Sequence, residues 1–259
     1  MLSLGILASG KGTDFQAIMD HIKLRVLTGT KIAILVTNRS TAEVISRAEK
    51  AGVDSRYVEG ISGMKFSTKE EKEAKRLQFD KEAVEIFAAQ GVDLIVSAGF
   101  NQILSTHMVK EFKNRITNIH PASDIERFGG PGMVGLKVHQ AVIDAGESSS
   151  GCTVHYIDST VDRGPVIVRA EVPVLKNDTA ESLSERVLVL EHRTYPKAIQ
   201  LHADNRVVID EMKRKVFLDL YSDTWELEWY KRQRSYFSYQ EDEWRKSGRD
   251  LRIILNPLR

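Results

Sequence analysis

The chain has 259 residues, of which 42% are hydrophobic and 28% charged, so it can bury a large core. Its 37 Lys and Arg residues balance 36 Asp and Glu residues, and a net charge of +1 gives no electrostatic reason to expect nucleic acid or an anionic membrane as a partner. The single cysteine, Cys152, excludes a disulfide framework or thiolate zinc site within one chain. No apolar run reaches the roughly 18 residues of a membrane span, and we expect a cytoplasmic protein.

Short β-branched runs alternate with longer helical patterns along most of the chain. Strands are predicted at 4–8, 31–36, 93–97 and 115–120, and helices at 15–26, 42–51 and 69–90. A strand pair at 152–157 and 165–174 follows, and then a helix at 179–201. This order predicts an α/β domain over residues 1–202, with a mostly parallel, twisted sheet covered by helices on both faces and an antiparallel strand pair toward its C-terminal end.

Residues 203–259 differ in composition and are expected to form a C-terminal accessory extension. This segment holds all three tryptophans and four of the seven tyrosines: Trp225, Trp229, Trp244, Tyr221, Tyr230, Tyr236 and Tyr239. Its charges are balanced, so stacking on single-stranded nucleic acid is not expected. Two interpretations stay open: the aromatic residues cover the main domain, or they contact a second copy in a homodimer.

A glycine-containing loop, Ser9 to Thr13, separates the first predicted strand from the first helix. Glycines allow backbone N–H groups to converge, and the positive end of the following helix would favour an anion, so this loop could hold a phosphate. The spacing of a P-loop is absent, and so is the third glycine of a dinucleotide fingerprint. A merely tight strand–helix turn is the alternative.

Asn118 and His120 end the predicted strand 115–120 and share one side of it, because alternate residues of a strand face the same way. Ligands bind at the carboxyl ends of strands in open α/β sheets, and an amide beside an imidazole suits a reaction that places negative charge on a carbonyl oxygen. The alternative is that Asn118 caps a turn and His120 is a satisfied core residue.

Asp162 lies in the turn Val161-Asp162-Arg163-Gly164-Pro165 between two strand-like runs. Aspartate is a common turn former, but this carboxylate could instead accept the proton released when an amine attacks a carbonyl. The seven histidines show no HExxH spacing, so no metal is expected, and the absence of a GxSxG elbow argues against a nucleophilic serine.

Seven sequence blocks, in this order, resemble the phosphoribosylglycinamide formyltransferase family, the glycinamide ribonucleotide transformylases. The resemblance covers about residues 3–202 and is carried by SGKGTDFQAI (9–18), SAGFNQIL (97–104), NIHP (118–121), FGGPGMVGLKVHQAV (128–142), GCTVHYID (151–158), VDRGPVI (161–167) and LEHRTYP (190–196). It implies a Rossmann-like fold and transfer of the formyl group of 10-formyltetrahydrofolate to the amine of glycinamide ribonucleotide, a step of purine synthesis.

The resemblance also implies roles for individual residues. Asn118 and His120 would stabilise the oxyanion, and Asp162 would assist proton transfer and favour a protonated His120. The ribonucleotide is expected at Gly12, Thr13, Asp14, Leu188 and Glu191. The folate is expected at Arg76, Asn101, Gln102, Ile103, Leu104, Asn118, Asp158, Ser159, Thr160, Val161 and Asp162.

The chain departs from the family pattern at Asp14, where asparagine is usual, and at Asn101 and Gln102, where apolar and arginine side chains are common. Alternatives are therefore a formyltransferase of the same fold acting on another amine, such as an amino-sugar nucleotide, and a non-catalytic folate-binding homologue. A methionyl-tRNA formyltransferase is less expected, because its tRNA partner calls for a basic surface.

Overall fold

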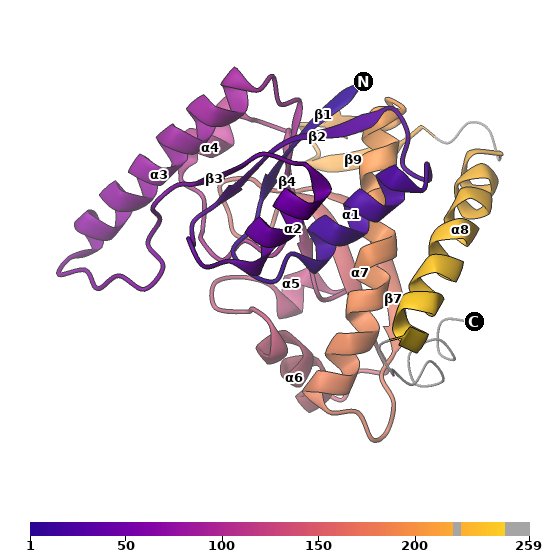
Figure 1. The fold of residues 1–259 in the computed structure, drawn as a ribbon. Coiled ribbons are helices and arrows are strands. Elements are labelled where there is room, and N and C mark those ends of the chain that lie inside the picture. Colours follow the sequence, from indigo (N-terminus) through magenta and orange to yellow (C-terminus); the bar gives the residue numbers. More distant parts are fainter. Residues whose placement is uncertain (220–223, 247–259) are drawn as a thin grey trace.

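The computed structural model describes residues 1–219 and 224–246, which form a seven-stranded sheet with flanking helices, a separate hairpin and a long final helix (Figure 1). The strands are β1 (Leu2–Leu7), β2 (Thr30–Thr37), β3 (Ser55–Tyr57), β4 (Leu94–Ser97), β5 (Ile116–His120), β6 (Ser149–Tyr156), β7 (Val166–Pro173), β8 (Val207–Asp210) and β9 (Lys215–Leu218). The helices are α1 (Thr13–Lys23), α2 (Glu43–Ala51), α3 (Lys69–Ala89), α4 (Thr106–Glu111), α5 (Ile125–Phe128), α6 (Leu136–Asp144), α7 (Ala180–Ala203) and α8 (Thr224–Lys246).

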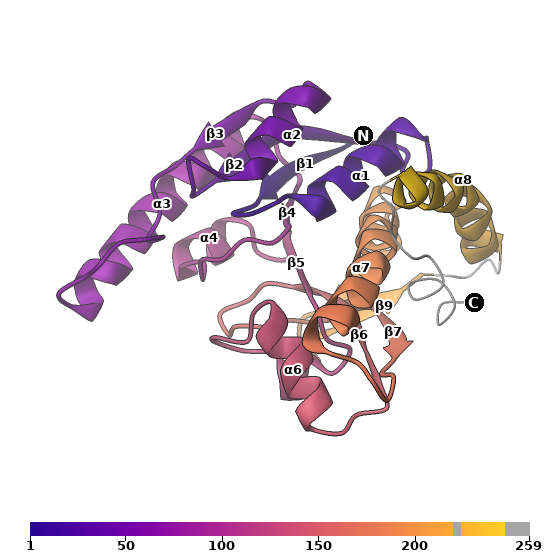
Figure 2. The same cartoon turned by 60° about the horizontal axis from the view of Figure 1, so that its bottom comes forward.

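The main sheet has the strand order β3-β2-β1-β4-β5-β6-β7. Its first five strands pair in parallel, whereas β6 runs antiparallel to both β5 and β7. The expected mostly parallel sheet with an antiparallel pair toward the C-terminal end is therefore confirmed. Helices α1, α2, α6 and α7 cover one face, and α3 and α4 cover the other (Figure 2).

Strand β1 shows why the sheet is buried on both sides. Leu4 and Ile6 belong to the core cluster under α1 and α7, whereas Leu7 belongs to the cluster under α3 and α4. Successive side chains of a strand face opposite sides of the sheet, so a nearly continuous apolar run supplies both layers.

Several short elements were not expected from the sequence, namely β3, α4, α5, α6 and the β8–β9 hairpin. The first helix begins at Thr13 and ends at Lys23, whereas the apolar pattern predicted 15–26. Gly12 sets its start: this residue has a φ of 70°, and a Cβ there would lie 2.4 Å from Val44 Cγ2. Glycine is therefore required both by the left-handed turn and by the close packing of α2.

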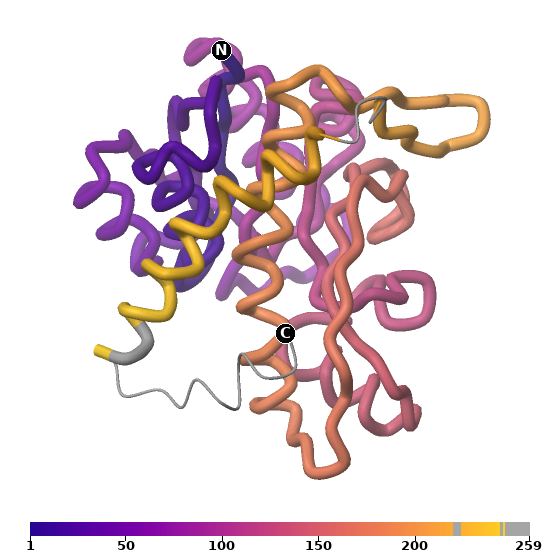
Figure 3. Tube along the Cα trace, turned by 90° about the vertical axis from the view of Figure 1, so that its right-hand side faces the viewer, coloured from indigo at the N-terminus to yellow at the C-terminus, as the bar shows by residue number. Residues whose placement is uncertain are grey.

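The C-terminal segment places α8 along α1 and α7 (Figure 3). Trp225, Trp229 and Tyr236 are buried in a cluster with Ala17 of α1 and Leu201 of α7. These aromatic side chains thus cover the main domain, which favours the first of the two interpretations for them. Tyr221 and the side chain of Trp244 lie outside the described residues. Within the described ranges, no helix is both long and apolar enough to cross a membrane.

Candidate active site

A cavity of about 610 Å³ opens at the carboxyl ends of β4 and β5 and is closed by the loop after β6 and by α7. Most residues predicted for the site line it: Asp14, Asn101, Gln102, Ile103, Leu104, Asn118, His120, Asp158, Ser159, Val161, Asp162 and Glu191. Gly12, Thr13, Arg76, Thr160 and Leu188 do not line it. Segments from five separate parts of the chain therefore converge on one space.

The three residues with the predicted catalytic roles lie together in this cavity. Asn118 and His120 share one side of β5, as the alternation predicted. His120 Nδ1 lies 3.6 Å from Asp162 Oδ2, although the two residues are 42 positions apart in sequence. The imidazole and the carboxylate are thus close enough to share a proton with a small movement or through one water molecule.

The backbone of Asp162 is held in an uncommon conformation, with a φ of 54°. Aspartate and asparagine tolerate this left-handed region better than most other residues. The backbone N–H of Gly130 donates a 2.9 Å hydrogen bond to Asp162 Oδ2, and Gly130 itself has a φ of 108°. A glycine turn and a strained aspartate therefore fix the carboxylate at the cavity wall.

Asp162 is ionised in this setting. Burial is the largest single influence and by itself would raise its pKa, but the contacts with the His155 side chain and the Gly130 N–H, together with the neighbouring imidazoles of His120 and His155, outweigh it. The net effect lowers the pKa of Asp162 below its ordinary value of 3.8. The cavity thus holds a carboxylate, which can accept a proton from a bound amine.

His120 behaves differently from the expectation that Asp162 would favour its protonated form. The Asp162 carboxylate and the hydrogen bond to the Phe128 carbonyl do raise the pKa of His120, but burial acts more strongly in the opposite direction. The net effect lowers the pKa of His120, which favours its neutral imidazole. The expectation was wrong because the sequence shows that a carboxylate is near but not how deeply the ring is buried; only 5% of the His120 side chain is exposed.

His155 is a site residue that the sequence reasoning did not assign. It lies on β6 directly opposite Asn118 in the antiparallel register. Asn118 Nδ2 is 3.3 Å from His155 Nε2, and this ring nitrogen is also 3.6 Å from Asp162 Oδ1. His155 therefore connects two members of the predicted trio. His155 lies in the sequence block GCTVHYID, but its place in the site follows only from the register of β6 against β5.

The glycine loop before α1 lies next to the cavity, with Arg47 of α2 beside it. Arg47 Nε donates a 2.7 Å hydrogen bond to the Lys11 carbonyl, and Arg47 NH1 lies 3.4 Å from Gln16 Oε1. The loop thus has a helix N-terminus and a nearby guanidinium, the two features that favour a bound phosphate. Arg47 was also missed in the sequence, because nothing local to α2 connects it with this loop.

Asp14 and Glu191 form a pair of buried carboxyl groups at the cavity wall. Burial raises the pKa of both groups, and for Glu191 the nearby Asp14 raises it further. Asp14 Oδ1 has no hydrogen-bond partner and lies 3.9 Å from His192 Nε2. Two negative charges so close together are unfavourable, so the pair holds a proton more readily than ordinary carboxylates do. Asp14 therefore repels a phosphate at the glycine loop less than a fully ionised aspartate would.

The polar side chains of the segment 101–104 form hydrogen bonds with neighbouring segments of the chain. Asn101 Oδ1 accepts a hydrogen bond from Asn38 Nδ2 at 3.2 Å, and the Asn101 N–H donates to Ser9 Oγ at 3.0 Å. Gln102 Oε1 accepts from the Ile61 N–H at 3.0 Å. The unusual residues at these two positions therefore anchor the segment to its neighbours, and the exposed side chain of Ile103 remains available to a ligand.

Arg76 lies on α3 and pairs with Glu73 one turn earlier, with 2.7 Å between Arg76 NH1 and Glu73 Oε1. It is also near Asp80, whose carboxylate accepts a hydrogen bond from the Ser105 N–H. Arg76 is not among the residues that line the cavity, and its predicted role in ligand binding stays a prediction.

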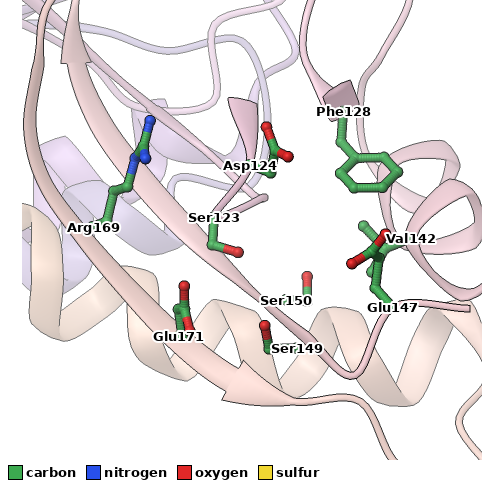
Figure 4. A pocket seen from close by; sticks show the side chains of 9 residues that line it. All are labelled: Ser123, Asp124, Phe128, Val142, Glu147, Ser149, Ser150, Arg169 and Glu171. Carbon is green, nitrogen blue, oxygen red and sulfur yellow. The ribbon is translucent and has the colours of Figure 1, made fainter. Parts of the chain in front are cut away.

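A second, smaller cavity of about 230 Å³ shares no lining residue with the first (Figure 4). It is lined by Ser123, Asp124, Phe128, Val142, Glu147, Ser149, Ser150, Arg169 and Glu171. None of these belongs to the predicted site, so the larger cavity is the candidate active site. Among the described residues, no group of three or more His, Cys, Asp or Glu side chains is arranged to hold a metal ion.

Comparison with known proteins gives a consistent result. A sequence model of the formyl transferase family matches residues 3–199. Phosphoribosylglycinamide formyltransferase of Escherichia coli is 31% identical over 210 residues, which cover 81% of this chain and 91% of that protein. The crystal structure of glycinamide ribonucleotide transformylase 1 from Symbiobacterium toebii superposes with a TM-score of 0.73 at 36% identity, covering 84% of this chain and 94% of that one.

A longer relative shows the same similarity. The trifunctional purine biosynthetic protein adenosine-3 of Gallus gallus is 34% identical over 210 residues. These residues cover 81% of this chain but only 19% of that protein, so the chain spans a small part of the relative's length. The family match covers most of the chain and coincides with the sheet and the cavity described above. The chain therefore belongs to the formyl transferase family and is a relative of the phosphoribosylglycinamide formyltransferases.

Proposed function

We propose that the protein transfers the formyl group of 10-formyltetrahydrofolate to the amine of glycinamide ribonucleotide, as a step of purine synthesis. The observation that carries this proposal is the convergence of Asn118, His120 and Asp162 on one cavity, beside a helix N-terminus suited to a phosphate. Both substrates are small molecules, and the near-neutral charge of the chain agrees with the absence of a nucleic-acid substrate.

The reaction begins when the amine nitrogen attacks the formyl carbon, which forms a C–N bond and moves the carbonyl electron pair onto oxygen. The Asn118 amide donates a hydrogen bond to this oxyanion, and such a donor typically contributes about 10²–10³ in rate. Neutral His120 takes up the amine proton, directly or through water. The imidazolium that results is stabilised by Asp162 and donates to the same oxygen.

The tetrahedral intermediate then collapses. The carbonyl re-forms, the bond to the folate nitrogen breaks, and that nitrogen receives a proton from the site. The products are the formylated amine and tetrahydrofolate, so atoms and charges balance without a metal or redox partner. Asp162 assists both proton movements, and such general-base help is commonly worth about 10²–10⁴ in rate.

We also propose where each part of the two substrates binds. The phosphate is placed at the glycine loop with Gly12, Thr13 and Arg47, and the ribose and glycinamide portions are placed toward Asp14 and Glu191. The folate is placed along the segment 101–104 and the loop 158–162. Formation of the intermediate therefore requires both ligands in the one cavity.

The proposal is tested by incubating the purified chain with 10-formyltetrahydrofolate and individual amines, and following the absorbance change of the folate product. We expect turnover with glycinamide ribonucleotide. Turnover only with an amino-sugar nucleotide would replace the substrate in the proposal, and tight folate binding without turnover for any amine would identify a non-catalytic homologue.

A further inference from the structure

The β8–β9 hairpin lies beyond the part of the chain matched by the family model and projects past the end of α7 (Figure 3). One of its faces is apolar and packs against the main core through Val207, Ile209, Val216 and Leu218. Alternation on a strand places these four side chains on the same side, while Val208 and Phe217 are exposed. The hairpin is thus anchored to the domain, and the position of its turn is fixed.

The turn of this hairpin reaches the loop that carries Asp162. Arg214 NH2 forms an ion pair with Asp158 Oδ2, at the beginning of the loop, and donates a 3.2 Å hydrogen bond to the Arg163 carbonyl, at its end. One guanidinium nitrogen therefore joins the two ends of the segment 158–163. Asp162 and its positive φ lie between these two contact points.

The loop 158–163 also contacts the segment 125–130. Arg163 donates from its guanidinium to the carbonyls of Ile125 at 2.7 Å and Glu126 at 2.9 Å. The Gly130 N–H holds the Asp162 carboxylate from the same side, which is formed by the segment 125–130. From the hairpin, Arg214 contacts both ends of the same loop, through Asp158 and the Arg163 carbonyl.

The same turn also contacts the segment that leads into β5. Glu211 pairs with Lys113 at 2.7 Å and accepts a hydrogen bond from Asn114 Nδ2 at 2.9 Å. Strand β5 begins two residues later and carries Asn118 and His120. The hairpin turn therefore connects the two stretches of chain on which the proposed catalytic residues lie.

We propose that Arg214 is a positioning residue, which closes the base of the loop 158–163 and thereby sets the place of Asp162 relative to His120. We call the contacts of Arg214 with Asp158 and with the Arg163 carbonyl the clamp. Its effect on catalysis rests on the proposed function, whereas its effect on the loop does not. The β8–β9 hairpin thus supports the active site and does more than cover the sheet.

The test compares Arg214→Met with Lys213→Met. Met keeps an unbranched side chain but removes the donors, and Lys213 is a cation of the same turn that pairs with Asp210 inside the hairpin. We expect Arg214→Met to raise the KM for the formyl donor and lower kcat, with kcat/KM reduced about 3- to 10-fold, as fits an exposed ion pair plus one hydrogen bond. The KM for the amine should not change, and Lys213→Met should match the wild type.

Two further readouts separate positioning from a general loss of structure. Hydrogen exchange should quicken in residues 158–163 of Arg214→Met while the β1 and β4 amides keep their protection. Arg214→Lys should restore part of kcat/KM, and the difference between wild type and Arg214→Met should shrink in 1 M salt, because the contact is exposed to solvent. Unchanged exchange in 158–163 together with wild-type kinetics would overturn the proposal.

The outcomes also distinguish the two proposals. If the wild-type chain shows no formyl transfer, the proposed function fails, but the exchange comparison still tests the clamp. If transfer occurs and Arg214→Met matches the wild type in both measurements, the function stands and the clamp fails. A double-mutant cycle with Asp158→Asn, which keeps an acceptor for the Thr160 N–H, measures the coupling between Asp158 and Arg214.

Discussion

Asn118 and His155 face each other across the antiparallel pair of β5 and β6, with Asn118 Nδ2 3.3 Å from His155 Nε2. His155 Nδ1 lies 2.9 Å from the Tyr156 carbonyl, which can only accept, so Nδ1 carries a proton, and in the neutral ring Nε2 accepts from the amide. This bond fixes which end of the Asn118 amide points toward the ring. The second N–H of the amide is left for the cavity.

Replacement of His155 by phenylalanine should lower kcat about 5-fold, because the Asn118 amide loses the acceptor that orients it, and one such hydrogen bond is worth about 1 kcal/mol. The KM values should change less than kcat. Steady-state kinetics with both substrates give this separation. A variant that kept its kcat would show that Asn118 is oriented by other contacts.

Asp162→Asn should reduce kcat about 10²- to 10⁴-fold while the protein stays folded. Asparagine tolerates the positive φ of Asp162 and can still accept from the Gly130 N–H, so the change removes the charge with little effect on the loop. Circular dichroism and urea unfolding check the fold. Asp54→Asn, an exposed position away from the cavity, serves as the control and should leave kcat unaltered.

Arg47→Ala should raise the KM for a phosphate-bearing amine roughly 3- to 30-fold, with kcat nearly unchanged, because charge-assisted hydrogen bonds to an anion are among the stronger ones. The change also removes the bond that braces the Lys11 carbonyl. Arg56→Ala removes an exposed arginine that donates to the neighbouring Ser55 carbonyl, and it should have no effect. Equal KM values for the two variants would argue against a phosphate at the glycine loop.

Trp229→Ala should destabilise the protein by about 3–5 kcal/mol, the usual cost of removing a buried tryptophan. Trp229 is fully buried between α8 and the main domain, and none of the α8 side chains that the structure describes lines the cavity. The midpoint of urea unfolding should therefore fall, while kcat of the folded enzyme is retained. Tyr230→Ala, at a side chain that is 51% exposed, should change stability far less.

His21 should make the protein less stable in mild acid. Burial lowers its pKa from 6.5 to about 4, with a smaller contribution from Arg193, and its ring packs against Tyr236 of α8. Above pH 6.5 the ring is neutral in both the folded and unfolded states, so its contribution is fully present. Between pH 6.5 and 4 the unfolded chain binds a proton that the folded chain excludes, and stability falls by up to about 3 kcal/mol.

The measurement is the free energy of unfolding of the wild type and of His21→Leu across pH 4.5 to 7.5. The leucine variant lacks the proton-binding group, so the wild type should lose stability relative to this variant as the pH falls from 6.5 to 4.5. Parallel curves would show that His21 does not titrate in this range.

The sequence predicted the sheet and its long helices well, because runs such as Lys31 to Val36 are apolar on both faces of the strand. It also placed Asn118 and His120 on one side of β5, since alternation is a local property. It did not predict β3, which has three residues, or the role of His155, which depends on a register set by the whole antiparallel pair. The pKa of His120 depends on burial by distant segments and was wrongly anticipated for that reason.

The left-handed backbone of Asp162 also has an evolutionary consequence. Few residues adopt this conformation without strain, and asparagine, one of them, is a single nucleotide change away from aspartate. A single-base change at this codon therefore leaves the loop its conformation while it removes the carboxylate, so under the proposed function such a substitution costs turnover rather than folding.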